Sequence, residues 1–481
     1  MIRVSLVAGD ALQFEGRGPA PAGLRVAGPR AVSAASISAT DAGWTAVLPL
    51  RVSRWGRPEL ALPSGTYRLE LDGPAPGSAE IAPLARTVAE TLAVEVRDGQ
   101  VIVGPPLTEA DAAPAGQAAL ERAYADRSDD LENAVFFESF YGRNASCNPR
   151  AIDAEIARIA PTVVRYWSVV DRSVEVPPGA VAVVEGSPEW WRARGAARLL
   201  VVNDWLRRRF VRRPGQRVLQ TWHGTPLKRL ALDRPGFDPR RALAVVRESR
   251  RWDVLLAQNP YAARILRTAY AFGRRPVWVE GYPRNDVLLS GDRDAVRRAL
   301  GVGPDERVLL YAPTWRDDRE QMVDFLDLQK LAQDAGATVL VRGHSRTLLP
   351  GADATGPRVV DVTGYPDISA LLLAADALIT DYSSVMFDFT ATGKPVHFFV
   401  PDLEHYRGRL RGFYFDLAER APGPLAATQD ELTAGLNDPD VPQRFAERYA
   451  SWSARFNARD DGRAAERVVA RLLDQGMISR D

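Results

Sequence analysis

The chain has 481 residues, of which 46% are hydrophobic and 26% charged, a composition typical of a globular protein with two or three domains. The 62 basic and 61 acidic residues leave a formal net charge of +1. A single cysteine, Cys147, excludes an internal disulfide and suits a reducing compartment. No apolar run approaches the roughly 18 residues that a membrane-spanning helix needs, and we expect no signal peptide in the short, interrupted apolar start.

Residues 1–104 have the pattern of a small β-rich domain. Apolar and polar residues alternate with period two in 44–48 and 66–71, and 94–103 predicts a hairpin around an Asp-Gly turn. Short strands separated by Pro and Gly indicate a small sandwich. Because this region has no histidine or cysteine, we interpret it as an accessory module, followed by a Pro- and Ala-rich linker at 105–116.

From about residue 117, short apolar runs alternate with longer helical patterns, which is typical of parallel α/β sheets. We place two doubly wound, Rossmann-like domains at 117–285 and 286–481, the second ending in a helical tail. The predicted strands of the first are 162–166, 199–203, 218–221, 254–257 and 277–280, and those of the second are 308–312, 338–342, 359–362, 377–380 and 396–399.

A polar loop with a histidine follows the predicted strand 218–221. Residues 220–228 read QTWHGTPLK and contain His223, one of only four histidines. Open α/β sheets bind ligands at the carboxyl ends of their strands, and histidine is the side chain best suited to move a proton near neutral pH. By itself, the stretch is also compatible with a structural turn around a hydrogen-bonded histidine.

A second polar turn follows the predicted strand 377–380. Asp381, Ser383 and Ser384 lie between this strand and a helix-like segment. Serine hydroxyls beside the free N–H groups at the start of a helix bind phosphate. From the local pattern alone, two ordinary helix-capping serines are the favoured interpretation.

Together, these two stretches resemble the CDP-glycerol glycerophosphotransferase family, the teichoic-acid primases and polymerases of bacterial cell walls. Further similar stretches follow in the family's order: FESFYG at 137–142 with Asn148-Pro149, GYPRND at 281–286, YAPTWR at 311–316, VRGH at 341–344 and GKP at 393–395. An ordered series is more specific than any single motif. The resemblance implies two Rossmann-like domains facing across a cleft, the GT-B arrangement.

The resemblance also implies a reaction: glycerol phosphate passes from CDP-glycerol to a hydroxyl of a lipid-linked teichoic-acid-type polymer or its primer, and CMP is released. His223 is the expected general base, and His344 is the second catalytic histidine, near the donor diphosphate. Expected contacts to the CDP-alcohol donor are Thr314, Arg316, Arg342, Asp381, Ser383 and Ser384. Expected residues of the acceptor side or cleft are Gly142, Trp222, Gly224, Thr225, Lys228 and Asn285.

We expect neither a cofactor nor a metal. Asp292 and Asp294 form a D-x-D triplet at the start of an apparent helix, which we interpret as a cap rather than a Mg²⁺ site. The absence of a Walker-type loop or a G-x-G-x-x-G after a strand argues against ATP or NAD chemistry. We assign His397 to the core and give His405 no role. Ser345 replaces the family's usual proline after the second histidine, which leaves the donor alcohol open.

Positive charge is concentrated between Arg207 and Arg275, where 18 basic and 4 acidic residues give 18 − 4 = +14. Such a surface attracts anionic membranes or polyanions, although an arginine-rich solvated surface is the alternative. We therefore expect a cytoplasmic protein bound peripherally to the inner face of the membrane, with no nucleic-acid partner. The oligomeric state stays open.

Two kinds of alternative function remain at this stage. Within enzymes, a ribitol-phosphate transferase or a nucleotide-sugar GT-B glycosyltransferase would share the fold and the diphosphate site. Outside enzymes, a transferase fold that has lost catalysis could bind an anionic polymer. The presence of both motif histidines, Arg316 and the serine pair favours an enzyme.

Overall fold

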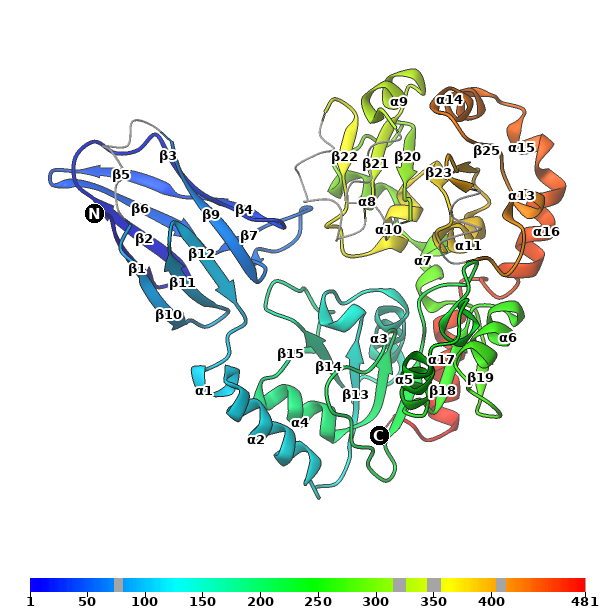
Figure 1. Ribbon diagram of the computed structural model, residues 1–481, viewed down its shortest axis with the longest axis horizontal. Helices are drawn as coiled ribbons and strands as arrows, with labels where there is room; N and C mark the ends of the chain where they lie inside the picture. Colours follow the sequence, from blue (N-terminus) through cyan, green and yellow to red (C-terminus); the bar gives the residue numbers. More distant parts are fainter. Residues whose placement is uncertain (73–80, 315–325, 344–355, 404–411, 481) are drawn as a thin grey trace. The chain divides into compact units, whose positions relative to one another are not determined.

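The computed structural model describes residues 1–72, 81–314, 326–343, 356–403 and 412–480 (Figure 1). The chain divides into two compact units. The first comprises Met1–Glu132, Phe140–Ala145 and Arg165–Ala197, and the second comprises Asn133–Ser139, Ser146–Val164 and Arg198–Asp481.

The first unit begins with a β-sandwich. One antiparallel sheet has the order β1-β2-β6-β5, made of β1 (Arg3–Val7), β2 (Ala11–Gly16), β6 (Gly43–Pro49) and β5 (Ser36–Thr40). The other has the order β10-β11-β12-β9-β3-β4, made of β10 (Leu84–Val88), β11 (Ala93–Arg97), β12 (Gln100–Gly104), β9 (Gly65–Asp72), β3 (Gly23–Ala27) and β4 (Val32–Ala34). A short pair, β7 (Arg51–Val52) and β8 (Leu60–Ala61), completes it.

The two sheets of this sandwich share one apolar core. Phe14 and Leu48 from the first sheet are fully buried beside Val26 and Val101 from the second. The predicted hairpin is present as β11 and β12, and its Asp98 and Gly99 have φ angles of 50° and 68°, as the favoured two-residue hairpin turn requires. The predictions of a sandwich and of this hairpin are confirmed.

The rest of the first unit carries α1 (Glu109–Ala112), α2 (Pro114–Ala125), a 3-10 turn η1 (Phe140–Gly142), the parallel strands β14 (Val164–Val169) and β15 (Val181–Val184), and α4 (Pro188–Ala196). Residues 105–116, expected to form a linker, therefore contain α1 and the start of α2.

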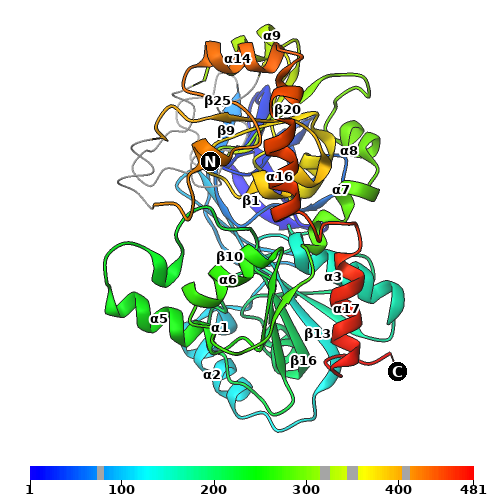
Figure 2. The ribbon, with the colours of Figure 1, turned by 90° about the vertical axis from the view of Figure 1, so that its right-hand side faces the viewer.

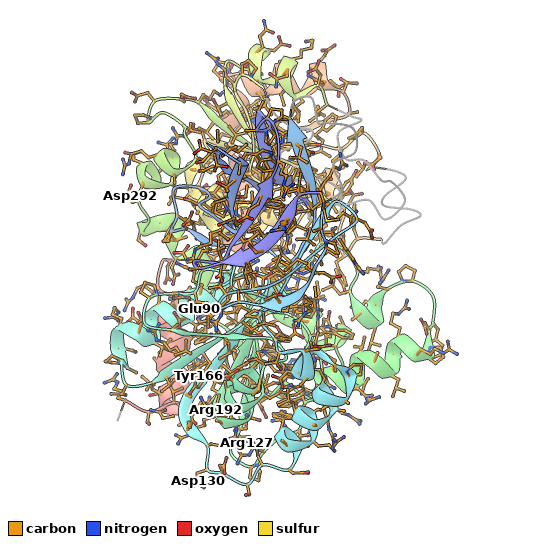
Figure 3. The ribbon with its side chains drawn as sticks, turned by 90° about the vertical axis from the view of Figure 1, so that its left-hand side faces the viewer. Glu90, Arg127, Asp130, Tyr166, Arg192 and Asp292 are labelled. Atoms are coloured by element: carbon orange, nitrogen blue, oxygen red, sulfur yellow. The ribbon has the colours of Figure 1, made fainter. Side chains whose placement is uncertain are left out.

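Polar contacts join these elements within the first unit. Tyr166 and Arg192, labelled in Figure 3, both hydrogen-bond Glu132, at 3.0 and 3.2 Å. The sandwich is attached to the loop after β14, because the Ser64 amide donates to Asp171 at 2.8 Å.

The second unit contains two parallel sheets. In the first, the strands of this unit lie in the order β13-β16-β17-β18-β19: β13 (Glu132–Glu138), β16 (Ala197–Val202), β17 (Arg217–Gln220), β18 (Val254–Ala257) and β19 (Val277–Val279). The adjoining helices and turns are α3 (Cys147–Ile159), η2 (Ala231–Asp233), α5 (Pro239–Ser249), α6 (Pro260–Ala269), η3 (Pro283–Asn285) and α7 (Val287–Ser290).

The second sheet of this unit is parallel throughout and has the order β22-β21-β20-β23-β24-β25. Its strands are β20 (Val308–Tyr311), β21 (Thr338–Val341), β22 (Val359–Asp361), β23 (Ala377–Thr380), β24 (Val396–Phe399) and β25 (Leu425–Ala426). The order reverses between β20 and β23, and ligands of open α/β sheets bind beside such a switch point.

Helices α8 (Arg293–Ala299), α9 (Leu328–Asp334), α10 (Ile368–Ala374), α11 (Val385–Phe389), the 3-10 turn η4 (Thr390–Thr392) and α13 (Leu417–Arg420) accompany this sheet. The tail forms α14 (Gln429–Asn437), α15 (Val441–Arg444), α16 (Ala446–Phe456) and α17 (Ala464–Asp474), as predicted. Figure 2 shows α17 beside α3, so the last helix returns to the first parallel sheet. Asp286 accepts hydrogen bonds from the amides of Ala464 and Ala465 at the start of α17, at 3.0 and 2.8 Å.

The α/β fold class predicted from the sequence is confirmed. Each of the ten strands predicted after residue 117 is present, and β18, β23 and β24 have the predicted bounds. Asp292 caps α8 by accepting from the Ala295 amide at 2.9 Å, as expected. His397 lies buried in β24, where burial lowers its pKa to about 4, in keeping with a core residue.

Candidate active site

His223 lies in a loop that begins where β17 ends at Gln220. Trp222, just before it, adopts a φ of +54°, a strained value for a large side chain. The buried Trp222 ring stacks on the His223 ring at 4.8 Å between centroids and contacts Tyr270 edge-on at 4.9 Å. The strained backbone is thus held by aromatic packing, which keeps the imidazole in one orientation.

One hydrogen bond determines which nitrogen of His223 carries a proton. Its Nδ1 lies 2.5 Å from the backbone carbonyl of Asn203, at the end of β16. A carbonyl oxygen only accepts, so Nδ1 must be the donor and Nε2 of the neutral ring keeps a lone pair. Nε2 is therefore the ring atom that can accept a proton, and the side chain is half-buried.

The surroundings favour the neutral ring. Burial, the largest effect, lowers the pKa of His223 below its usual 6.5, and Arg284 lowers it further. The Asp204 carboxylate and the Asn203 carbonyl act in the opposite direction but do not reverse the shift. A neutral imidazole at pH 7 can act as a general base.

Two buried amide side chains hold the loop around His223. Gln220 accepts a hydrogen bond from the Trp222 amide and donates one to the Asp204 carbonyl, both at 2.9 Å. Asn148 donates to the Trp222 carbonyl at 3.2 Å. The amide and the carbonyl of Trp222 are therefore both bound by side chains from other elements.

Gly224 brings this loop against the predicted phosphate-binding turn. A Cβ atom placed on Gly224 would lie 2.5 Å from Oγ of Ser384 and 2.9 Å from its Cβ, so a larger residue would require Ser384 to shift. The backbone next to His223 thus lies against Ser384, the second serine of the pair that follows β23. Two motifs 160 residues apart form one site.

Asp381 and Thr314 lie together at the switch point of the second sheet. Both oxygens of the buried Asp381 carboxylate accept from the Thr314 amide, at 2.8 and 3.0 Å, and Oδ1 also accepts from the Tyr382 amide at 2.5 Å. Asp381 therefore holds the loop after β20 against the turn after β23. This arrangement favours a supporting role for Asp381.

A buried ion pair anchors α11, the helix that follows Ser383 and Ser384. Arg284 binds Asp388 at 2.6 Å, and their side chains are only 5% and 3% exposed. Asn285 donates to the same carboxylate at 3.0 Å, and the Arg284 amide donates to Asn148 at 3.2 Å. The Asp388 pair is thus linked through Asn148 to the backbone of the His223 loop.

Two basic residues of the motifs bind backbone carbonyls. Arg342 donates to the carbonyls of Val362 and Tyr365, and burial lowers its pKa to about 10. Lys394 donates to the carbonyl of Ala375 at 2.6 Å, and burial lowers its pKa to about 8. These contacts favour structural roles for both cations.

The remaining predicted residues lie as follows. Thr225 is fully buried and donates to Gln258 at 2.6 Å, and Asn285 is buried as described above, so neither presents its side chain to solvent. Lys228 pairs through its backbone with Phe413. Gly142 lies in the first unit, where its carbonyl accepts from the Val170 amide. His344 and Arg316 lie outside the described residues.

Sequence reasoning missed the residues that support the site: Gln220, Asn203, Asn148, Arg284 and Asp388. Gln220, Asn148 and Arg284 lie within the motif stretches described above, and Asp388 lies in the helix-like segment after the serine pair, so proximity to a motif was the available signal. Within the described residues, no group of three or more His, Cys, Asp and Glu is arranged to hold a metal ion.

Comparison with known proteins gives one consistent result. The family described as CDP-Glycerol:Poly(glycerophosphate) glycerophosphotransferase matches residues 125–474. The chain is 36% identical over 368 residues to a teichoic acid poly(glycerol phosphate) polymerase of Bacillus subtilis (strain 168), covering 72% of this chain and 49% of that protein. It is 34% identical over 379 residues to a teichoic acid glycerol-phosphate transferase of Staphylococcus aureus (strain NCTC 8325 / PS 47), covering 71% of this chain and 93% of the relative.

Solved structures agree with the sequence relatives. The wall teichoic acid polymerase TagF aligns with a TM-score of 0.68 and 34% identity over 75% of this chain and 94% of that chain. A variant of that polymerase has also been solved after a soak with CDPG. The chain covers 49% and 52% of the length of two teichoic acid poly(glycerol phosphate) polymerases, so it spans about half of each of these relatives.

Proposed function

The chain belongs to the CDP-glycerol:poly(glycerophosphate) glycerophosphotransferase family, and on that premise we propose that it transfers glycerol phosphate from CDP-glycerol to a hydroxyl of a lipid-linked polyol-phosphate acceptor. The acceptor oxygen forms a bond to the phosphorus that carries glycerol, the bond from that phosphorus to the bridging oxygen breaks, and CMP leaves. The observation that carries the proposal is the contact of Gly224 with Ser384, which brings a histidine base and a serine-rich turn together.

In this reaction His223 is the general base. Nε2 accepts the proton of the acceptor hydroxyl as the oxygen approaches phosphorus, while Nδ1–H stays bonded to Asn203. The Asn203 carbonyl also favours the imidazolium that forms, because it remains a hydrogen-bond acceptor. Phosphoryl transfer needs chiefly positioning and charge stabilisation, and the loop that Gln220 and Asn148 hold supplies the positioning.

The donor diphosphate is assigned to the turn after β23. Ser383 and Ser384 are half-buried, the Ser384 hydroxyl lies beside Gly224, and Asp381 at the start of the same turn binds the Thr314 amide. We assign Arg316 and His344 to the same diphosphate on their place in the family motifs. Such charge-assisted contacts stabilise negative charge as it moves onto the leaving phosphate.

A donor screen tests this proposal. Purified protein is incubated with CDP-glycerol, CDP-ribitol or UDP-glucose and a lipid-linked glycerol-phosphate primer, and release of CMP or UDP is measured. We expect CMP release from CDP-glycerol, dependent on the primer. Turnover with CDP-ribitol alone would redirect the proposal to ribitol phosphate, and turnover with UDP-glucose alone would replace phosphate transfer by glycosyl transfer.

We further propose that the enzyme binds the membrane surface through α5 and the loop before it. Figure 2 shows this segment projecting from the rest of its sheet region. Phe237 is 89% exposed and Leu243 is 61% exposed, and the basic residues around them include Arg240 and Arg247. Exposed apolar side chains flanked by arginines are typical of a segment that lies at an anionic bilayer surface.

Part of the basic region makes contacts within the protein, which differs from the expectation that the region as a whole faces a membrane. Arg212, near the start of the basic region, bonds both oxygens of Asp253 at 2.6 Å and is therefore engaged within the protein. The segment around α5 is thus the better candidate for contact with lipid. No helix in the described part of the chain is long and apolar enough to cross a membrane.

A further inference from the structure

The turn that joins α16 to α17 contains a buried carboxylate (Figure 2). Asp460 in this turn is 8% exposed, and both of its oxygens accept hydrogen bonds. Oδ2 accepts from the side-chain amides of Gln258 at 2.7 Å and Asn457 at 2.9 Å, and Oδ1 accepts from the Tyr282 backbone amide at 3.2 Å. No basic side chain in the described part of the chain pairs with this carboxylate, so neutral donors alone hold it.

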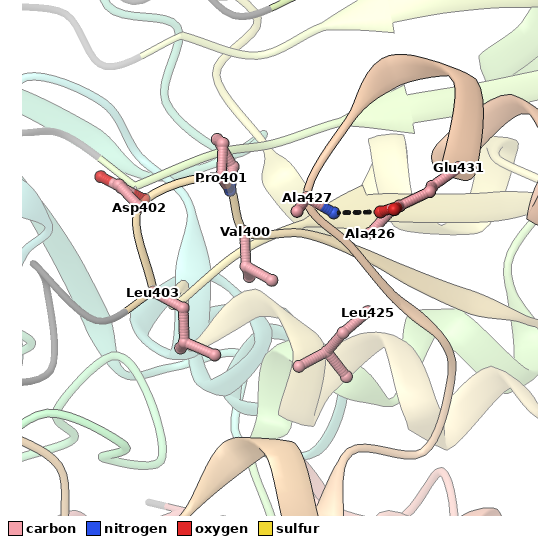
Figure 4. A pocket seen from close by; sticks show the side chains of 8 residues that line it. All are labelled: Val400, Pro401, Asp402, Leu403, Leu425, Ala426, Ala427 and Glu431. Atoms are coloured by element: carbon pink, nitrogen blue, oxygen red, sulfur yellow. Dashed lines mark hydrogen bonds between the residues drawn. The ribbon is translucent and has the colours of Figure 1, made fainter.

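These partners come from distant parts of the chain. Gln258 and Tyr282 are 202 and 178 residues away from Asp460. Glu431, another acid of the tail, instead accepts from the nearby Ala427 amide at 2.8 Å as part of the cap of α14 (Figure 4). Burying a carboxylate without a counter-charge costs free energy, so the long-range contacts of Asp460 call for a reason beyond local capping.

Gln258 extends the contact to the loop that contains His223. Its Oε1 accepts from the Thr225 hydroxyl at 2.6 Å, and the same hydroxyl accepts from the Asn259 side chain at 3.0 Å. These three polar side chains are fully buried. Thr225 lies two residues after His223 and directly follows Gly224, whose backbone lies against the donor turn. A series of hydrogen bonds therefore runs from the tail to the part of the loop that follows the histidine.

The ionised carboxylate fixes the direction of the bonds in this series. Burial raises the pKa of Asp460 to about 6, so at neutral pH the group only accepts. The amide nitrogen of Gln258 must therefore face it, which turns Oε1 toward Thr225. The Thr225 hydroxyl then donates to Oε1, and its oxygen stays free to accept from Asn259. This one arrangement satisfies every member and holds the loop in one position.

We propose, resting on the proposed function, that Asp460 is a positioning residue for glycerol-phosphate transfer. Through Gln258 and Thr225 it holds the backbone that follows His223, so that Nε2 meets the acceptor hydroxyl beside the donor turn. Positioning of this kind contributes to kcat, because a small displacement of a base relative to the reacting atoms slows the reaction steeply.

Binding of the donor should depend less on Asp460. Helix α11, which follows the serine pair, keeps its ion pair with Arg284 and a hydrogen bond from Asn457 to the Phe387 carbonyl at 2.6 Å. Neither contact involves an oxygen of Asp460. Loss of the carboxylate should therefore lower kcat and leave the KM for CDP-glycerol nearly unchanged.

Asp460→Asn tests the inference, because it preserves the size of the side chain and removes one acceptor. Three donors converge on the two oxygens, so the introduced NH2 group meets an N–H donor in either orientation. We expect kcat to fall about 10–100-fold, with the KM for CDP-glycerol changed less than about threefold. Amide hydrogen exchange in residues 221–228 should become faster, while exchange in the β-sandwich stays as in wild type.

An exchange of the two side chains supplies the rescue. Gln258→Glu alone places two carboxylates together and should also lower kcat. Combined with Asp460→Asn, it again pairs one carboxylate with one amide, and a glutamate oxygen accepts from Thr225. The kcat of this double variant should lie at least about threefold above either single variant. Asp461→Asn is the matched control, since the neighbouring Asp461 is 54% exposed and pairs with Arg467, and its kcat and exchange should equal those of wild type.

The outcomes separate the two proposals. Wild-type turnover of CDP-glycerol with an unchanged kcat in Asp460→Asn overturns the inference and leaves the proposed function standing. A lowered kcat that the double variant does not raise also overturns the inference, because the effect then does not pass through Gln258. Wild-type protein that turns over no CDP-alcohol overturns the proposed function and, with it, this role of Asp460.

Discussion

The buried pair of Arg284 and Asp388 should be essential to both stability and alignment of the site. Asp388→Asn leaves the Arg284 guanidinium buried without its counter-charge, because the two side chains are 5% and 3% exposed and 2.6 Å apart. Breaking a pair of this kind by removing one partner typically costs about 3–5 kcal/mol of the free energy of unfolding. We expect a loss in that range.

The assay is urea denaturation followed by tryptophan fluorescence, with an exposed pair as control. Arg25 and Glu70 lie 2.6 Å apart, but their side chains are 52% and 26% exposed, so Glu70→Gln should cost less than about 1 kcal/mol. Arg284→Met combined with Asp388→Leu should be less destabilising than Asp388→Asn alone, because no uncompensated charge remains. A loss below about 1 kcal/mol for Asp388→Asn would refute the reasoning.

Three further predictions concern the site and its surface. The kcat should rise with pH through an apparent pKa below 6.5 and then level off, because burial lowers the pKa of His223 and only its neutral ring accepts a proton. A pH–rate profile in the acid range checks this, and a midpoint above 7 would contradict it. Gln220→Leu should lower kcat about tenfold or more and also alter the pH profile, because the Trp222 amide loses its hydrogen-bond acceptor. The matched change Gln13→Leu, which removes an exposed side-chain hydrogen bond, should do neither. The double variant Phe237→Asp, Leu243→Asp should co-sediment less with anionic vesicles, while its turnover of a water-soluble primer should be unchanged. Equal vesicle binding by this variant and wild type would exclude α5 as the membrane contact.

The parallel strands were predictable because their signals are local. Val254–Ala257 and Ala377–Thr380 are continuous buried runs, and such runs between helical patterns indicate parallel strands. β25 has only two residues and β15 only four, with exposed Val181 at its start, so neither gave a comparable signal. Eight of the ten predicted strands contain at least three successive buried residues, and the exceptions are β19 and β22, which have three residues each.

The internal geometry of the site was not predictable, because it depends on contacts between distant parts of the chain. His223 was identified from its motif, but its protonated nitrogen is set by a carbonyl 20 residues away. Arg284 and Asp388 are separated by 104 residues, and nothing local marks either as a partner of the other. Arg342 illustrates the converse, since its motif suggested a ligand contact while its guanidinium binds two carbonyls.

The most direct test of the central claim is a paired measurement on His223→Ala. Initial rates of CMP release from CDP-glycerol with primer are compared with wild type, and CMP affinity is measured on the same preparations. Loss of a general base should lower kcat by about 10²–10⁴-fold with CMP affinity unchanged, because His223 acts on the acceptor and not on the nucleotide. A variant with near-wild-type kcat would contradict the account.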